Sequence, residues 1–192
     1  MTRSAVPRDK VVGLVVALAC LAFSAIGLKV NEPPEFTYVD GVRGQTVRIE
    51  GAELTVDEVK VGTRLVRRGV VEAETTGMFV TVAATLAVPG PQRVTLNQSH
   101  LVTADRTYDN VTSSSVAADP GFQQSQDLVF EVDPRQIDDL TLEIWYGGIV
   151  HGFYQRARIH LGITAENAEQ WRRAAPGRDL EPDPYGTVEA LP

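Results

Sequence analysis

The chain has 192 residues, enough for one domain of ordinary size with flanking segments, and its composition is that of a globular protein. Of its 18 basic and 25 acidic residues, four basic and one acidic precede position 31, so residues 31–192 carry a formal charge of −10. Because nucleic acid and anionic lipid surfaces repel such a charge, we do not expect either as a partner of this part of the chain.

An apolar segment, Val11 to Val30, dominates the amino-terminal part of the sequence. It contains no acidic residue and one basic residue, Lys29, near its end. At about 1.5 Å per helical residue it is long enough to cross a hydrocarbon core of roughly 30 Å. Residues 1–10 carry three basic side chains and are expected to stay in the cytoplasm. The sequence therefore predicts a single-pass protein of the cell membrane whose carboxyl-terminal domain is extracytoplasmic.

Two alternatives to a retained anchor stay open. A signal peptidase would find small residues at Ala22 and Ser24, although the apolar run exceeds the usual signal core of about 7–15 residues. Lipid attachment at Cys20 would need a small residue where Leu18 stands. We interpret Cys20 as part of the membrane helix. As it is the single cysteine, no disulfide framework is expected.

Residues 31–44 are predicted to be a linker, because the pair Pro33-Pro34 stops the preceding helix and favours an extended chain. Residues 45–164 are then typical of short strands separated by turns. Gly77 to Val88 alternates most regularly, and a change of phase at Asp57-Glu58 predicts a turn or a bulge. Arg67-Arg68-Gly69 is predicted to be a turn. Further segments with strand character are 45–49, 52–66, 94–96, 101–103, 127–132, 140–144 and 158–163.

Strands at intervals of about ten residues, without long helical patterns, favour an all-β immunoglobulin-like β-sandwich. The periodicity changes after Thr164, which is expected to cap a short helix over residues 165–175 that contains Trp171. Pro176-Gly177 ends this helix. Residues 176–192 are rich in proline and acidic side chains, so the sequence predicts a disordered acidic tail.

Several packing and turn patterns resemble those of a known family. They are Met78 to Leu86, Val94-Thr95-Leu96, Thr103-Ala104-Asp105 with Tyr108, Asp119-Pro120-Gly121, Leu128 to Pro134, and Leu140 to Ile144. Their order is similar to the telokin-like, immunoglobulin-like domain of unknown function in bacterial surface and lipid-anchored proteins, over about Gln45 to Ile163. The sequence departs from that family at Val88-Pro89-Gly90-Pro91, where an Asn-Gly-like turn is usual, and it lacks the lipid-attachment motif of many relatives. The resemblance implies an extracytoplasmic β-sandwich and supplies no catalytic residue.

The sequence gives no indication of catalysis, of a cofactor or of a metal site. No Gly-x-Ser-x-Gly motif accompanies its histidines, His100, His151 and His160, and these lack the closely spaced ligand pair of a zinc site. Asp105 and Asp109 do not have the spacing of a calcium-binding EF-hand loop. We expect the protein not to be an enzyme.

Aromatic residues gather near the last strand, among flexible glycines. This pattern suits a contact surface, because aromatic side chains bury much area at little entropic cost. The candidate partner-binding residues are Trp145, Tyr146, His151, Phe153 and Tyr154, with Trp171 on the predicted helix. An equally open interpretation is that these residues close the end of the sandwich, and that Trp171 packs on its own domain.

Two functions remain after these exclusions. The first is a membrane-anchored, non-catalytic interaction or accessory module of the bacterial cell envelope, which binds a membrane protein or another envelope component. The alternative is an extracytoplasmic domain that binds a small ligand beneath the aromatic loop.

Overall fold

The computed structural model describes residues 36–112, 115–148, 155–183 and 185–192. The predicted membrane segment 11–30 and its flanks, residues 1–10 and 31–35, lie outside these residues. Within the described part of the chain, no helix is both long enough and apolar enough to span a membrane.

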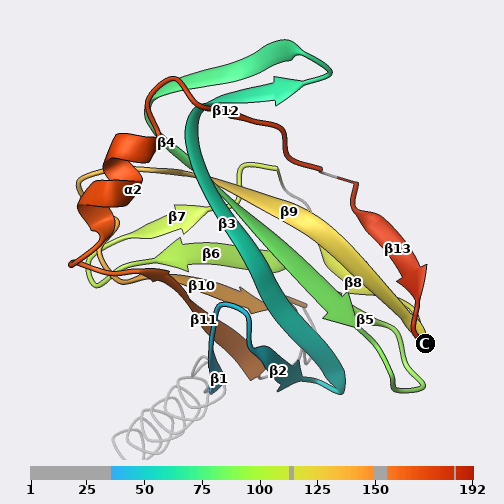
Figure 1. Ribbon diagram of the computed structural model, residues 1–192. Helices are drawn as coiled ribbons and strands as arrows, with labels where there is room; N and C mark the ends of the chain where they lie inside the picture. The colour runs from blue at the N-terminus through green and yellow to red at the C-terminus, as the bar shows by residue number, and fades with distance from the viewer. Residues whose placement is uncertain (1–35, 113–114, 149–154, 184) are drawn as a thin grey trace, which may run out of the picture. The chain divides into compact units, whose positions relative to one another are not determined.

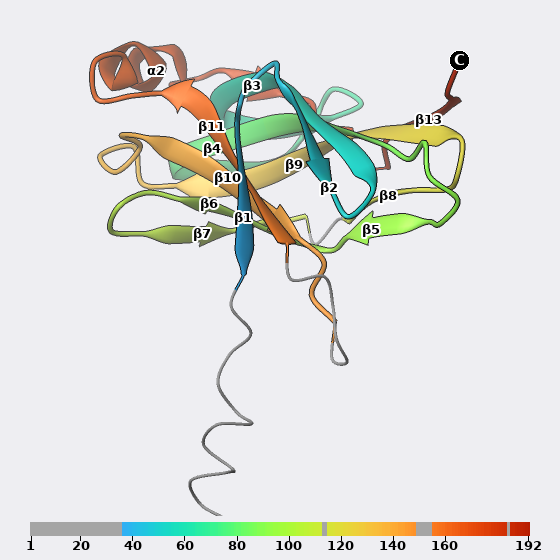
Figure 2. The ribbon, with the colours of Figure 1, turned by 90° about the horizontal axis from the view of Figure 1, so that it is seen from below.

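The described residues form an all-β sandwich of two main sheets, which Figures 1 and 2 show as stacked layers. Sheet A has the strand order β1-β11-β10-β6-β7, and sheet B the order β12-β3-β4-β9-β13, with β2 paired to β3. Sheet A consists of β1 (Thr37–Val42), β6 (Gln98–Val102), β7 (Thr107–Asp109), β10 (Leu140–Trp145) and β11 (Gln155–Ile163). Sheet B consists of β2 (Thr46–Ile49), β3 (Ala52–Arg67), β4 (Val70–Ala87), β9 (Phe122–Val132), β12 (Asp179–Leu180) and β13 (Thr187–Ala190). A small third sheet pairs β5 (Val94–Leu96) with β8 (Val116–Ala118).

The core lies between the two sheets and follows from the period-two alternation of the strands. From β4 and β9 of sheet B, Val80, Val82 and Phe130 point inward, and from sheet A, Leu142 and Ile159 meet them; all five are fully buried. The intervening residues of each strand face outward, so the outer face of sheet A is available for polar and aromatic side chains. The predicted β-sandwich is confirmed at this level.

Two local predictions hold in detail. The pairing of β3 with β4 shifts register between Val56 and Glu58, which is the bulge that the change of phase predicted. Arg68 and Gly69 link the two strands with φ values of 51° and 78°. Positive φ at both central residues is the mark of a type I′ hairpin turn, which matches the twist of the flanking strands. The central strand begins at Val70, earlier than the predicted Gly77.

The predicted linker is wrong over Thr37–Val42, which forms β1 and pairs in parallel with β11. Its residues alternate, with Tyr38 and Asp40 exposed while Gly41 is buried. A side chain at Gly41 would overlap Val47, with a Cβ atom only 2.4 Å from Val47 Cγ1. The absence of a side chain at position 41 therefore lets β2 lie against β1. Two shorter strands, β7 and β8, lie in segments to which the sequence analysis assigned no strand.

The predicted disordered tail is also wrong for the described residues after 176. β12 pairs in parallel with β3 at one edge of sheet B, and β13 pairs antiparallel with β9 at the other edge. We call residues 179–190 the strap. Leu180 holds it on the outer face of the sheet, where it is buried against Phe79 and Val129. This apolar contact stabilises the strap, although the acidic composition of the segment had suggested disorder.

The short helix, α2 (Ala168–Ala174), lies at one end of the sandwich (Figure 1) and begins after Asn167 rather than Thr164. Trp171 is partly buried against the main core. Arg172 Nε donates a hydrogen bond of 2.6 Å to the carbonyl oxygen of Pro134. The helix is therefore fixed to the domain by both its apolar and its charged side chains.

Because Leu180 is buried, a substitution at this position tests whether the strap is ordered on the sheet. We expect Leu180→Ala to lower the free energy of unfolding by about 2 kcal/mol, the lower end for a buried leucine, because its cluster is small. Val188→Ala, on the exposed strand β13, should change it by less than about 0.5 kcal/mol. Urea denaturation measures both, and equal values for the two variants would contradict an ordered strap.

Candidate functional site

Of the six predicted site residues, the structure describes Trp145, Tyr146 and Trp171, and it places Trp171 apart from the other two. Trp145 ends β10 and Tyr146 follows it, whereas Trp171 lies on α2 and packs against the main core. The remaining three predicted residues, His151, Phe153 and Tyr154, lie outside the described residues. Trp145 is only 8% exposed, although it is not part of the main core cluster. It therefore belongs to a second set of contacts on the outer face of sheet A.

Neighbouring strands build this set through their register. Trp145 on β10 lies across from Arg156 on β11, and Arg156 is the partner of Tyr38 on β1. Because residues two apart share a face, Arg158 follows Arg156 outward and Glu143 accompanies Trp145. We call the outward residues Phe36, Tyr38, Glu143, Trp145, Arg156 and Arg158 the arginine–aromatic face.

Arg156 is the centre of the arginine–aromatic face. Its guanidinium carbon lies 4.1 Å from the ring centroid of Phe36 and 3.7 Å from that of Trp145, so the cation stacks on both rings. Its Nη1 donates a 2.8 Å hydrogen bond to Oε2 of Glu143, and the two side chains are only 16% and 13% exposed. A planar guanidinium can stack and pair at once, which lysine does not do equally well. The cluster ties β1 to β10 and β11.

Arg158 repeats this arrangement nearer the solvent. Its guanidinium carbon lies 4.3 Å from the ring centroid of Tyr38, and its Nε donates a 2.7 Å hydrogen bond to Oδ1 of Asp40. This bond lowers the pKa of the Asp40 carboxyl and raises the pKa of Arg158. Tyr38 remains 43% exposed, so the face combines a fixed inner part with an accessible rim.

The two described histidines also lie on sheet A. His100 packs edge-on against Trp145 with 4.9 Å between ring centroids, and its Nε2 is 3.5 Å from Oδ1 of Asp109. His160 Nδ1 is 3.1 Å from Oγ1 of Thr141. In the described part of the chain, no three histidine, cysteine or acidic side chains come together to hold a metal ion.

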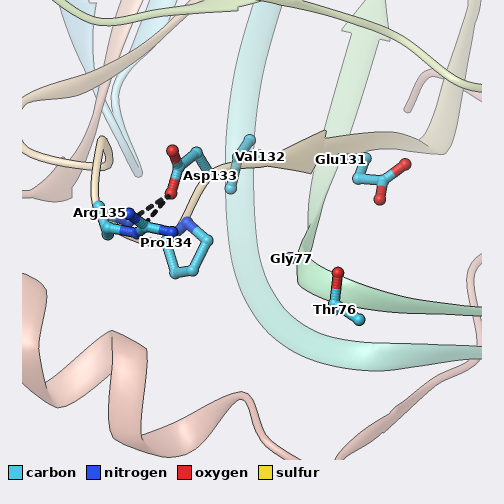
Figure 3. Close-up of a pocket in the computed structure, with 7 residues that line it drawn as sticks. All are labelled: Thr76, Gly77, Glu131, Val132, Asp133, Pro134 and Arg135. Atoms are coloured by element: carbon cyan, nitrogen blue, oxygen red, sulfur yellow. Dashed lines mark hydrogen bonds and ion pairs between the residues drawn. The ribbon is translucent and has the colours of Figure 1, made fainter.

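Two surface hollows lie away from these residues. The larger, about 370 Å³, is lined by Thr76, Gly77, Glu131, Val132, Asp133, Pro134 and Arg135 (Figure 3). The smaller, about 280 Å³, lies between the turn at Arg67-Arg68 and the strap residues Glu181 to Asp183 and Tyr185. Neither hollow is lined by Trp145 or Tyr146.

Sequence reasoning missed the residues that surround Trp145. A signal was present: Arg156, Arg158 and His160 alternate with the buried residues of β11, which places three cationic or ionisable side chains in one row. Phe36 and Tyr38 carried no such signal, because their strand had been assigned to the linker.

No family model matches the sequence, and no curated protein matches it. Among solved structures, the chain is similar to an uncharacterized β-sandwich protein from Clostridium difficile 630, with 12% identity and a TM-score of 0.42. The alignment covers 67% of this chain and 97% of that chain.

The Arg156 cluster leads to a prediction about stability. We expect Arg156→Ala to lower the free energy of unfolding by about 1–3 kcal/mol, because Glu143, whose side chain is only 13% exposed, loses its partner and two rings lose their stacked cation. Arg48→Ala breaks an exposed pair with Glu53 and should cost less than about 1 kcal/mol. Chemical denaturation provides the comparison, and similar losses in both variants would show that the cluster contributes no more than a surface ion pair.

The Asp40–Arg158 pair predicts a pH dependence. The folded pKa of Asp40 lies below its unfolded value, so the stabilisation is present above about pH 4 and is lost as the pH falls through the folded pKa. We expect Asp40→Asn to be less stable than the wild type at pH 7, by no more than about 1 kcal/mol because the pair is exposed. The difference should shrink as the pH falls below about 4. A difference that stayed constant from pH 7 to pH 2 would contradict the assignment.

Proposed function

We propose that the protein is a membrane-anchored, non-catalytic interaction module of the bacterial cell envelope, with its sandwich domain on the extracytoplasmic side. The apolar segment 11–30 and the basic residues before it support the anchor and its orientation. The formal charge of −10 on residues 31–192 favours a protein or another envelope component over nucleic acid or anionic lipid.

The strand order supports an immunoglobulin-like assignment of the sandwich. The order β11-β10-β6-β7 corresponds to strands G-F-C-C′ of a variable-type immunoglobulin domain, and β4-β9 corresponds to the neighbours B and E. The antiparallel pairing within these sets agrees with that topology. The resemblance to telokin-like domains of bacterial surface proteins is consistent with this order.

The observation that carries the proposal is the arginine–aromatic face. Tyrosine, tryptophan and arginine are the residues enriched in protein interfaces, and here they are held in place by stacking and ion pairs. A partner would therefore meet side chains that lose little conformational freedom on binding. Tyr38 and Arg158, with Asp40 paired to Arg158, supply the accessible part, whereas Trp145 and Arg156 are more deeply buried.

Of the two described histidines, His160 lacks the contacts of a catalytic base. His160 is within hydrogen-bond distance of a threonine hydroxyl, but no carboxylate is hydrogen-bonded to His160 among the described residues. An activated nucleophile needs its base oriented by such a third group.

A small-ligand-binding domain is the second candidate. The hollow of about 370 Å³ lies within the size range of ligand sites, although its lining is mostly polar and charged, whereas such sites are mostly apolar. Thermal-shift measurements separate the two functions, because a small ligand that binds the folded state raises the unfolding temperature of the isolated protein.

A site-specific crosslinking experiment tests the interaction face. We expect a photo-crosslinking residue at position 38 to capture one protein or envelope component in intact cells, because Tyr38 lies at the accessible rim. The same residue at position 188 serves as the control, since Val188 is similarly exposed on the opposite sheet. Equal capture at both positions, or none at position 38, would contradict the proposed face.

The anchor is tested separately by fractionation and mass. We expect the full chain to stay in the membrane fraction after alkaline carbonate extraction, and a variant without residues 11–30 to be released from it. The intact mass distinguishes the alternatives: a retained segment, cleavage after Ser24, or a lipid on Cys20. Full-length protein in the soluble fraction would overturn the membrane assignment.

A further inference from the structure

The hairpin of β3 and β4 extends beyond the two layers of the sandwich (Figure 1). β9 accompanies β4 only from Met78, which pairs with Val132, to the far end of the strand. From Val70 to Glu74, β4 pairs with β3 on one side, and no strand lies on its other side among the described residues. This side of β4 is therefore an open sheet edge, whose backbone groups can pair with another strand.

The opposite side of the same hairpin is covered. There β12 of the strap pairs with β3, aligning Asp179 with Arg64 and Leu180 with Leu65. The chain thus supplies a strand for one edge of this hairpin, and within residues 36–112, 115–148, 155–183 and 185–192 it supplies none for the other edge. Val70 and Val71 at the open edge are 66% and 48% exposed.

β9 stops beside the open edge for local reasons. Pro134 lacks the amide hydrogen that a continuing strand would need, and the chain turns away after Val132. A Cβ atom at Gly77 would lie 3.0 Å from the carbonyl oxygen of Val132, so glycine permits this close approach. The hollow of Figure 3 lies at the end of β9, with Pro134 and Arg135 on one side and Thr76 on the other. An added strand that continued the line of β9 would begin at this hollow.

The charges along the edge are mostly negative. Glu72 and Glu74 share one face of β4, and Glu131 and Asp133 lie at the end of β9. Arg67 Nε lies 3.1 Å from Oε1 of Glu72, and Arg135 Nε lies 3.8 Å from Oδ1 of Asp133. These four acidic and two basic residues give a local charge of −2.

Glu74 has no ion-pair partner among the described residues. Arg64, its register partner on β3, is paired with Asp179 of the strap at 2.7 Å. Glu74 therefore keeps its charge available to a strand that adds beside it. A second copy of the same edge would place glutamates against glutamates, which is unfavourable.

We propose that the open edge of β4, from Val70 to Glu74, is a strand-addition site for an extended basic segment of a partner protein. Backbone hydrogen bonds bind the segment, and lysine or arginine side chains at alternate positions lie opposite Glu72 and Glu74. This inference does not depend on the membrane anchor or on the arginine–aromatic face.

Synthetic peptides test the proposal on the full chain in detergent micelles. The probe is a fluorescent eight-residue peptide in which lysine alternates with valine and threonine, and the matched peptide carries glutamate in place of lysine. We expect the lysine peptide to bind at least about tenfold more tightly by fluorescence anisotropy, with an affinity that falls as salt is added. Equal affinity for the two peptides would overturn the proposal.

Charge reversal on the protein locates the site. The double variant Glu72→Lys with Glu74→Lys should reverse the preference, so that it binds the glutamate peptide more tightly than the lysine peptide. Glu166→Lys is the matched control, because Glu166 is an exposed acidic residue outside the strands. An unchanged preference in the double variant, or the same effect from the control, would refute the assignment to β4.

Methylation of the peptide backbone tests strand pairing without changing the protein. An added strand uses every second amide group for the sheet, so methyl groups on one alternate set of nitrogens should abolish binding. Methyl groups on the other set should change the affinity less than threefold. Similar binding by the two methylated peptides would rule out strand addition.

Discussion

The parallel pairing of β1 with β11 is the contact on which the outer face of sheet A depends. It joins residues as far apart in sequence as Asp40 and Arg158, and it fixes the position of Phe36 and Tyr38 beside the arginines of β11. Without that pairing, Arg156 would retain Trp145 and Glu143 but lose its second ring. Gly41 is the local requirement for this pairing, since any side chain there would collide with Val47 on β2. One small residue thus lets the first strand lie at the corner between the two sheets.

Much of the fold could be predicted from the sequence, because the alternation of apolar and polar residues indicates which side of a strand is buried. The run Met78 to Leu86 has buried residues at every second position, and the pattern identified both the strand and its inner face. The bulge at Asp57 could be predicted for the same reason, since it shifts the phase of the alternation. β1 could not be predicted, because Tyr-Val-Asp-Gly-Val alternates only weakly and the nearby pair Pro33-Pro34 suggests a linker. The strap was missed because a single buried leucine decides its position. The amino-acid composition of a segment does not show whether one of its residues is buried.

The candidate site shows a different limit of sequence reasoning. Trp145 was singled out from the sequence, but its neighbours Phe36, His100 and Arg156 come from three other segments of the chain. Register between strands, rather than residue type, determines that Arg156 lies beside Trp145 and that Trp171 does not. The open edge of β4 was equally hidden, because it exists only where β9 ends earlier than its neighbour.

The strap has a consequence for any form of the protein that lacks it. The strands that cover the edges of β3 and β9 follow the strands of the main core in the sequence. A chain that ended near residue 178 would retain the strands of the main core. It would also expose two further sheet edges, to which another strand could add. Loss of the strap, by premature termination or by proteolysis, would thus favour aggregation through the uncovered edges of sheet B.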